Sequence, residues 1–276
     1  MRQTQGSLVC AQCGKLIGIN EPSCPYCGAW RPGLYGFAPA LQRLVGQRLD
    51  FVSLIVMTCV TMYAISLLLD LSAAFSGGGL LSIASPGTRA LYQLGMTGGI
   101  AWGQDWWWTL FTANYLHGGL LHIVFNMMWI RNLAPAATEV YGPARAFVVF
   151  NIAGVVGFYL SNEMSGAPTI GASGGIFGLL AALIVHGRSR GSSMMTTQLW
   201  QWAGVLFLFG FLMPGINNWA HGGGFLGGWV AAQLMGFSGE QRESTGVIIT
   251  ALACIAVTAL GIWLSFARVT SILLGA

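Results

Sequence analysis

The sequence has very little charge. Only 7% of its 276 residues are Asp, Glu, Lys or Arg, whereas 55% are hydrophobic, and a soluble globular domain has roughly 25% charged residues. This composition excludes an ordinary soluble domain and predicts an integral membrane protein. The 40 glycines are scattered, which is typical of transmembrane helices that pack closely. No apolar run follows the polar residues at the start, so we expect no cleavable signal peptide.

Basic residues are too dispersed to form a nucleic-acid-binding patch. Apolar windows of about 20 residues predict seven membrane spans, near 51–71, 116–134, 145–162, 170–187, 199–213, 218–236 and 246–266. With a cytoplasmic N-terminus, ten of the twelve Lys and Arg residues fall inside and only Arg89 and Arg268 fall outside, in agreement with the positive-inside rule. We therefore expect an all-α protein of the bacterial inner (cell) membrane, with its net charge of +4 reflecting topology.

Residues 1–36 predict a small separate module, which residues 37–50 link to the membrane. The module contains two Cys-x-x-Cys-Gly pairs ten residues apart: Cys10, Cys13, Cys24 and Cys27. Four thiolates suit a tetrahedral zinc ion, and a glycine after each pair permits a tight turn. We expect a structural Zn²⁺ here. The alternatives are two disulfides, which a reducing cytoplasm disfavours, and a degenerate site that binds nothing.

Two polar residues stand out within apolar runs. Ser173 lies in Gly171-Ala172-Ser173-Gly174, and His221 is followed by three glycines. Polar groups at membrane depth are costly and often mark function, and a hydroxyl with an imidazole forms a nucleophile and its base. The flanking glycines allow close helix approach, which would bring the two side chains within hydrogen-bond reach. Alone, the serine has an alternative, a bond to its own helix backbone.

No carboxylate is expected near this pair. All eight acidic residues lie in loops or at span ends, so the pattern favours a Ser-His dyad over a Ser-His-Asp triad. Phe177, one helical turn after Ser173, is placed to stack on His221 and orient it. The alternative for Phe177 is simple packing.

A second polar group begins the second span. His117, His122 and Asn126 form His-x4-His-x3-Asn, and residues 122 and 126 share one helix face. Their donors suit an oxyanion hole, where charge develops in a transition state. The alternative is hydrogen bonding between packed helices, a common use of polar residues in membranes.

The region from 72 to 116 is expected to be a long loop on the outer side. It carries four tryptophans: Trp102, Trp106, Trp107 and Trp108. Such residues anchor proteins at the membrane interface. A second interpretation is a loop that dips into the bilayer and forms the lateral wall of a site. The two interpretations are compatible.

Together these elements resemble the rhomboid family of intramembrane serine proteases. The resemblance covers roughly residues 50–240 and rests on three motifs: 171–174 (Gly-x-Ser-Gly), 220–228 (Ala-His-x-x-Gly-x-x-x-Gly) and 117–126 (His-x4-His-x3-Asn). It implies a six-helix protease core over 51–240, followed in 241–276 by an additional seventh transmembrane helix. The N-terminal module resembles short zinc ribbons.

The resemblance also implies roles for matched residues. Ser173 would be the nucleophile and His221 the general base and then acid. His122, Asn126 and the backbone N–H of Ser173 would bind the oxyanion. Supporting positions would be His117, Gly171, Gly174, Phe177, Gly224 and Gly228, the last two letting the sixth span pack on the fourth. The family cuts transmembrane proteins in or near the bilayer, with the site open to the outer side and no catalytic cofactor.

Two positions depart from the family pattern. Trp108 follows Trp107 where the family often has an arginine, and Phe177 stands where some members have tyrosine. Two other functions are alternatives. A proteolytically inactive rhomboid-like binder of transmembrane clients usually lacks the serine or the histidine, and a small transporter would be expected to show an inverted repeat of spans.

Overall fold

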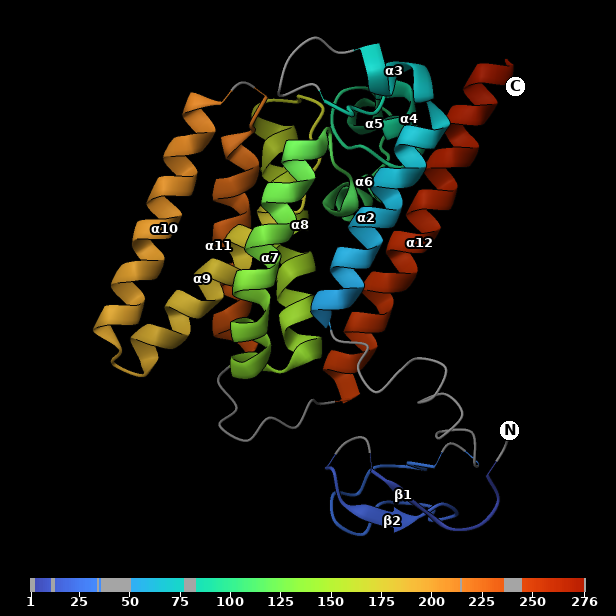
Figure 1. Ribbon diagram of the computed structural model, residues 1–276, viewed down its shortest axis with the longest axis vertical. Helices are drawn as coiled ribbons and strands as arrows, with labels where there is room; N and C mark the ends of the chain where they lie inside the picture. The colour runs from blue at the N-terminus through green and yellow to red at the C-terminus, as the bar shows by residue number, and fades with distance from the viewer. Residues whose placement is uncertain are drawn as a thin grey trace. The chain divides into compact units, whose positions relative to one another are not determined.

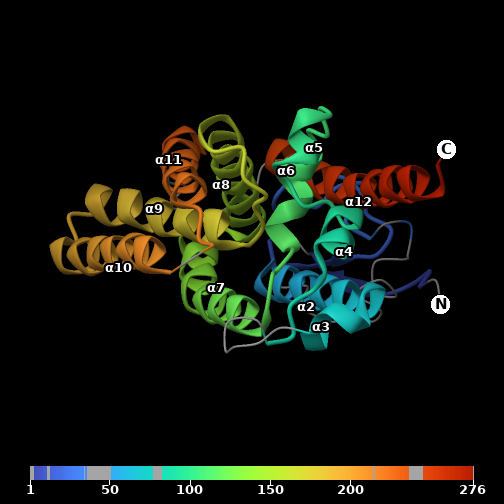
Figure 2. The ribbon, with the colours of Figure 1, turned by 90° about the horizontal axis from the view of Figure 1, so that it is seen from above.

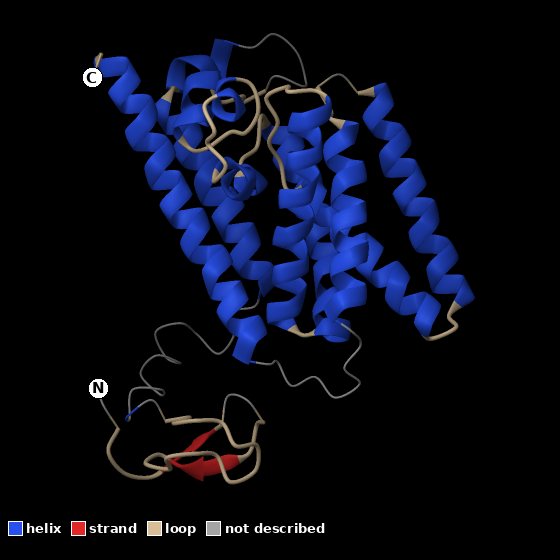
Figure 3. Ribbon diagram, turned by 180° about the vertical axis from the view of Figure 1, so that it is seen from behind, coloured by secondary structure: helices blue, strands red, loops and turns tan. Residues whose placement is uncertain are grey.

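The protein has two structural units. The structure, a computed structural model, describes residues 3–10, 13–33, 35, 51–76, 83–213, 215–235 and 245–275. A small unit lies within residues 3–35, and a helical unit comprises the described residues from Phe51 onward (Figure 1). Figure 3 shows that the strands of the described chain belong to the small unit. A helical membrane domain preceded by a small module is therefore confirmed, whereas the exact domain boundaries stay predictions.

The small unit is built on one β-hairpin. Strands β1 (Ser7–Val9) and β2 (Leu16–Gly18) pair antiparallel, with Leu8 opposite Ile17. Both side chains are buried together with Ile19, as expected for alternate residues on one sheet face. This core is too small to stabilise a domain without a staple such as a metal or disulfide.

The helical unit consists of long helices joined in part by short ones. Its elements are α2 (Phe51–Leu69), α3 (Leu71–Ser76), α4 (Thr88–Gln93), α5 (Ile100–Gly103), α6 (Thr109–Thr112), the 3₁₀ turn η3 (Ala113–Tyr115), α7 (Leu120–Tyr141), α8 (Pro143–Met164), α9 (Ser173–Ser189), α10 (Ser193–Leu212), α11 (Asn218–Met235) and α12 (Thr245–Leu274). The region expected to be a loop from 72 to 116 thus contains short helices, of which α4 and α6 contact the long helix α12.

Each of the seven predicted spans coincides with a long helix. Three of these helices are long and apolar enough to cross a membrane, namely Phe51–Leu69, Pro143–Met164 and Gly246–Leu274. Of the others, α9 has only 17 residues, and α7 and α11 carry the polar and glycine residues that lower hydropathy. The count of seven spans stays a prediction.

The bounds of the second span differ from the prediction of 116–134. Helix α7 begins only at Leu120, so His117 lies before it, and it continues through Pro135 to Tyr141. A proline removes one backbone hydrogen bond, but membrane helices tolerate it where neighbouring groups satisfy the freed carbonyl. The turn after α7 is sharp because Gly142 adopts a φ of 86° and Pro143 starts α8.

Helices α8, α9 and α11 contact one another through their backbones. Figure 2 shows the three helices side by side, seen from above. A Cβ atom placed on Gly224 of α11 would lie 2.8 Å from the Cα of Gly174 in α9, and one on Gly223 would lie 2.9 Å from the Cα of Gly157 in α8. Side chains at these positions would force the helices apart.

Gly228 shows the same constraint further along α11. A Cβ atom there would overlap the backbone of Gly178 in α9. We therefore expect Gly228→Ala to destabilise the helical unit by about 1–3 kcal/mol, the usual cost of overpacking. Thermal unfolding of the purified protein in detergent would show this as a lower midpoint.

Gly204→Ala is the matched control. Gly204 lies inside α10, and a Cβ atom there would meet nothing within 4 Å. Alanine is favoured over glycine in a helix by up to about 1 kcal/mol, so this variant should be as stable as the parent or more so. A Gly228→Ala protein that melts no lower than Gly204→Ala would contradict the packing argument.

Candidate functional site

Ser173 and His221 meet where two helices begin. Ser173 is the first residue of α9 and His221 lies in the first turn of α11. The Nε2 atom of His221 is 2.9 Å from the Oγ atom of Ser173. His221 is only 7% exposed, and Ser173 is partly buried. The two residues predicted as a pair are thus brought into hydrogen-bond contact.

The pair lies below the end of the bundle. Figure 1 shows α9 beginning part-way along the bundle, and its 17 residues extend over about 26 Å at 1.5 Å per residue. This is shorter than the roughly 30 Å of a bilayer core. The non-helical chain that leads to Ser173 therefore lies part-way along the bundle, where its buried backbone groups need hydrogen-bond partners.

The ring of Phe177 lies against the ring of His221. Their centroids are 4.6 Å apart and their planes differ by 23°. The Nδ1 atom of His221 is buried and has no hydrogen-bond partner among the described residues. Among the described residues no carboxylate therefore orients this imidazole through Nδ1, whereas the ring of Phe177 contacts it directly.

His122 directs one nitrogen toward the serine. The backbone N–H of Gly118 donates to Nδ1 of His122 at 3.3 Å, so a neutral ring carries its proton on Nε2. A Cβ atom on Gly171 would lie 2.7 Å from that Nε2 and 3.8 Å from the Ser173 Oγ. The missing side chain at Gly171, whose φ is 128°, leaves space between a donor and the hydroxyl.

Asn126 and His117 lie around His122. The Asn126 amide Nδ2 donates to the carbonyl of His122 at 2.8 Å, which leaves its second amide hydrogen for another acceptor. The His117 ring is fully buried and contacts the His122 ring edge-on, with centroids 5.1 Å apart. Asn126 and His117 therefore both contact His122, and their role as an oxyanion group stays a prediction.

Three backbone hydrogen bonds hold the chain that leads into Ser173. Gly99 donates to Gly166 at 2.8 Å, Thr169 donates to Thr97 at 2.9 Å, and Gly171 donates to Ala113 at 2.9 Å. The sequence did not indicate these contacts, because hydrogen bonds between backbone groups do not depend on which side chain a residue carries. They place the loop between α4 and α7 directly against the segment before the serine.

Asn217 is a further residue that sequence reasoning missed. Its Nδ2 lies 2.7 Å from Ser161 Oγ, 3.0 Å from Ser165 Oγ and 3.1 Å from Thr169 Oγ1, and its Oδ1 accepts the N–H of Trp219 at 3.1 Å. It thus ties the start of α11 to the end of α8 and to the segment before α9. Its position just before a helix was the available signal, since asparagine is favoured there.

The arrangement contains the groups that acyl transfer requires. A hydroxyl in contact with an imidazole is an activated nucleophile. The N–H groups in the first turn of α9 have no carbonyl partner within the helix, and together with His122 Nε2 they can stabilise a developing negative charge.

Comparison with known proteins places the chain in a family. A family model described as the Rhomboid domain matches residues 104–238. The chain is 33% identical over 154 residues to the "Putative rhomboid protease YdcA" of Bacillus subtilis (strain 168), a match that covers 52% of this chain and 74% of that relative. The chain belongs to the rhomboid family. It is an integral membrane protein, as the family and its apolar helices indicate.

Other rhomboid relatives match less of their own length. The "Rhomboid protease GluP" of Bacillus subtilis (strain 168) is 31% identical over 176 residues, which are 61% of this chain but 35% of GluP. The "RHOMBOID-like protein 7" of Arabidopsis thaliana is 31% identical over 148 residues, 50% of this chain and 47% of that relative. The Rhomboid domain match includes the Ser173–His221 pair and excludes α2, α12 and the cysteine module.

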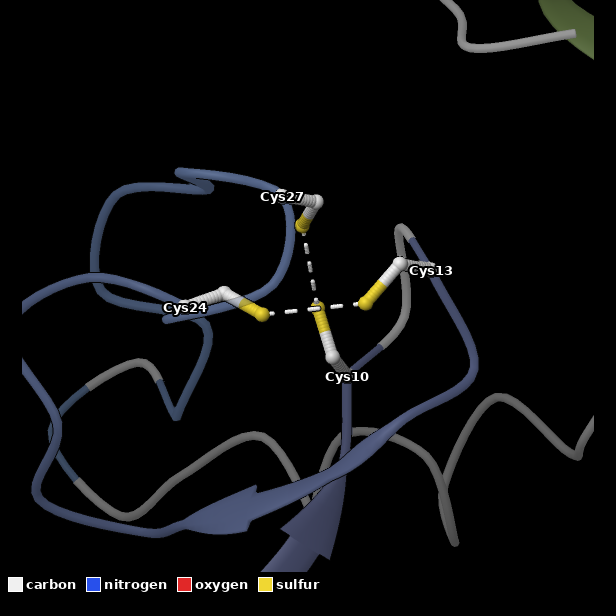
Figure 4. Close-up of side chains that lie close together, drawn as sticks. All are labelled: Cys10, Cys13, Cys24 and Cys27. Atoms are coloured by element: carbon white, nitrogen blue, oxygen red, sulfur yellow. Dashed lines mark hydrogen bonds between the residues drawn. The ribbon is translucent and has the colours of Figure 1, made fainter. Parts of the chain in front are cut away.

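The four N-terminal cysteines form a candidate metal centre. Their sulfur atoms all lie within 4.8 Å of one another, and Figure 4 shows the four thiols converging. The closest pairs are Cys13–Cys24 at 3.6 Å and Cys10–Cys27 at 3.8 Å. Sulfurs bound tetrahedrally at about 2.3 Å from zinc lie roughly 3.8 Å apart, whereas a disulfide requires about 2.05 Å.

The two Cys-x-x-Cys-Gly turns have the same geometry. Gly14 and Gly28 have φ values of 70° and 73°, and each donates its N–H to the carbonyl of the first cysteine of its pair, at 2.9 and 2.8 Å. Burial raises the pKa of Cys24, and hydrogen bonds from the backbone N–H groups of Tyr26 and Cys27 and from the thiols of Cys27 and Cys13 together lower that pKa to about 7. Metal ions bind cysteine in its thiolate form.

Changing Phe177 tests whether its ring orients His221. Phe177→Tyr keeps the ring, whereas Phe177→Leu keeps apolar bulk and removes the stacking contact. We expect Phe177→Leu to slow labelling of Ser173 by a fluorophosphonate about threefold to tenfold, since such ring pairs contribute roughly 0.5–1.5 kcal/mol. Phe177→Tyr should label at the parent rate. Equal rates for both variants would mean that Phe177 only fills space.

Proposed function

We propose that this rhomboid is an intramembrane serine endopeptidase that acts through a Ser173–His221 dyad. The proposal rests chiefly on the 2.9 Å contact between His221 Nε2 and Ser173 Oγ at buried helix starts. Polar groups at such depth are costly unless they serve function. The relatives named as rhomboid proteases add support.

In the first half of the reaction, Ser173 Oγ attacks the carbonyl carbon of the scissile peptide bond. The hydroxyl proton passes to Nε2 of His221 as the carbon–oxygen bond forms. The Nε2–H of His122, the free amide hydrogen of Asn126 and the N–H of Ser173 would stabilise the resulting oxyanion. When the carbon–nitrogen bond breaks, the imidazolium of His221 gives its proton to the leaving amine, and the acyl group remains on Ser173.

In the second half, water attacks the acyl carbon and His221 accepts one of its protons. Collapse of this second tetrahedral intermediate breaks the bond to Ser173 Oγ, which regains the proton from His221. The product carboxylate leaves, and the dyad returns to its starting state. No cofactor enters either half-reaction.

The proposed substrates are transmembrane proteins. We place the N-terminus in the cytoplasm of a bacterial cell, seven helices across the inner membrane and the dyad toward the outer side. The dispersal of Lys and Arg along the sequence supports this orientation. The short α9 supports a site that lies within the membrane and is reached from one side.

For the cysteine module, we propose a structural Zn²⁺ held by Cys10, Cys13, Cys24 and Cys27. The separations between their sulfurs and the small hydrophobic core of the unit support a bound metal as its staple. The ion would stabilise the hairpin and take no part in the proteolytic reaction.

Cleavage of a model transmembrane substrate in liposomes tests the protease proposal. Ser173→Ala and His221→Ala should each lower the cleavage rate by about a thousandfold or more, since a nucleophile and its base act as a unit. Ser189→Ala and His186→Ala are matched controls near the far end of α9, and they should retain the parent rate.

Two results would contradict the dyad. One is cleavage that persists in both Ser173→Ala and His221→Ala. The other is a parent protein that binds transmembrane segments but neither cleaves them nor reacts with a fluorophosphonate at Ser173. That second result would favour an inactive rhomboid-like binder.

Metal analysis tests the zinc proposal. The purified protein should contain about one Zn²⁺ per chain, because four cysteine ligands complete one tetrahedral site. The double variant Cys10→Ser/Cys13→Ser should lose it, whereas Cys254→Ser in α12 should keep it. Zinc at full occupancy in the double variant would be inconsistent with the site. We expect substrate cleavage to survive loss of the metal.

A further inference from the structure

The seventh helix, α12, packs on a part of the protein that is not the Ser173–His221 pair. Its main contacts are with α4, α6 and α8, and Figure 2 shows it running beside these elements. Because α12 lies outside the Rhomboid domain match, the dyad chemistry above leaves it without a role.

One buried hydrogen bond joins α12 to the tryptophan-rich loop. The indole Nε1–H of Trp108 donates to Ser265 Oγ of α12 at 2.9 Å. Trp108 is 8% exposed and Ser265 is fully buried. Trp108 also stacks on Trp106, with ring planes 12° apart, whereas Trp107 is exposed. Only Trp107 of these three is thus available as an interface anchor.

The bond depends on a close approach between α12 and the loop. A Cβ atom on Gly261 would lie 2.9 Å from Thr112 Cγ2 and 3.2 Å from Trp108 Cβ. Gly261 and Ser265 are one helical turn apart and share a face. This packing buries the indole N–H of Trp108, and a buried N–H without a hydrogen-bond partner is costly. Ser265 supplies that partner.

The same loop supports the segment before the serine. Trp108 immediately precedes α6, and Thr112 at the end of α6 donates through Oγ1 to the Gly95 carbonyl at 2.6 Å. The next residue, Ala113, accepts the N–H of Gly171, two residues before Ser173. Helix α6 thus contacts α12 through Trp108 and Thr112 and supports the serine segment through Ala113.

A second set of contacts follows the same route. The Thr109 hydroxyl donates to Thr97 Oγ1 at 3.0 Å, and Asn162 Nδ2 donates to the same oxygen at 3.0 Å. The Thr97 carbonyl accepts the N–H of Thr169 at 2.9 Å. Both ends of α6 are therefore connected to residues 169–171.

We propose that Ser265 and Trp108 are positioning residues, through which α12 sets the placement of Ser173 relative to His221. This inference rests on the proposed protease function. Nucleophilic attack is sensitive to displacements of the reacting groups by about 1 Å. Loosening the tryptophan-rich loop would shift Ser173 and lower turnover, although the dyad residues and the substrate contacts remain.

Variants at Ser265 test this role. Ser265→Ala removes the acceptor, and Ser265→Thr restores a hydroxyl. With a transmembrane substrate in liposomes, we expect Ser265→Ala to lower kcat about fivefold to tenfold, the range for loss of one buried hydrogen bond, with KM unchanged. Ser265→Thr should recover most of the rate. The rate of fluorophosphonate labelling at Ser173 should fall in parallel with kcat.

Thr258→Ala is the matched control. Thr258 is also a buried hydroxyl residue of α12, but it donates only to Cys254 of its own helix, at 2.8 Å. Trp108→Phe removes the donor, and the double variant Trp108→Phe/Ser265→Ala should be no slower than the slower single variant. The positioning role is overturned if Ser265→Ala matches Thr258→Ala in kcat, or if Ser265→Thr does not recover.

A readout independent of activity separates this inference from the proposed function. Amide hydrogen exchange at Thr169 and Gly171 reports directly on the contacts with the loop. Exchange should be faster in Ser265→Ala and unchanged in Thr258→Ala, even if the parent protein cleaves no substrate. Unchanged exchange in Ser265→Ala would overturn the link from α12 to the serine segment. If the parent protein cleaves no substrate but exchange is still faster in Ser265→Ala, only the protease proposal is overturned.

Discussion

The site depends on direct backbone contact between α11 and its two neighbours. Gly224 faces Gly174 of α9, and Gly223 faces Gly157 of α8, with no room for a Cβ atom on either α11 glycine. Ser173 and His221 lie at the starts of α9 and α11, so this contact sets how far apart they can be. In lipid, association of helices relies on close packing because the surroundings are as apolar as the side chains. A side chain of even one carbon in this interface would separate the helices and lengthen the 2.9 Å contact between the two residues.

Burying polar chemistry in this interface requires that every nearby backbone group has a partner. The segment 166–171 is not helical, and three of its backbone groups bond to the preceding loop: the Gly166 carbonyl to Gly99, and the N–H groups of Thr169 and Gly171 to Thr97 and Ala113. Asn217 joins this segment to the start of α11. The loop between α4 and α7 therefore supplies backbone partners that an apolar surrounding could not.

The sequence predicted those site residues that differ from their immediate neighbours or follow a short spacing pattern. Ser173 and His221 were polar residues in apolar runs, and the cysteine spacing indicated a tetrahedral site. Contacts between distant segments were not predictable in this way. The Trp108–Ser265 bond joins residues 157 positions apart, and the Ala113–Gly171 bond uses only backbone atoms. Helix α7 extends beyond the end predicted at 134 from the apolar window, because Pro135 lies inside the helix without ending it. Gly171 was expected to serve helix packing, and instead its positive φ and missing side chain leave open the space beside His122.

The helix packing and the hydrogen bonds that hold the segment before Ser173 differ in how far they allow atoms to move. Backbone-to-backbone packing of α11 on α9 leaves no adjustable side chain between the helices, so their spacing changes little without disruption. The segment before Ser173 has no such constraint, since single hydrogen bonds to the loop hold it. Small changes in the placement of the serine can therefore arise in the loop and in Asn217, which also holds this segment. Helix α12 packs against that loop, and its Ser265 accepts a hydrogen bond from the indole of Trp108. An additional helix outside the family domain can thus influence a hydroxyl that it does not touch.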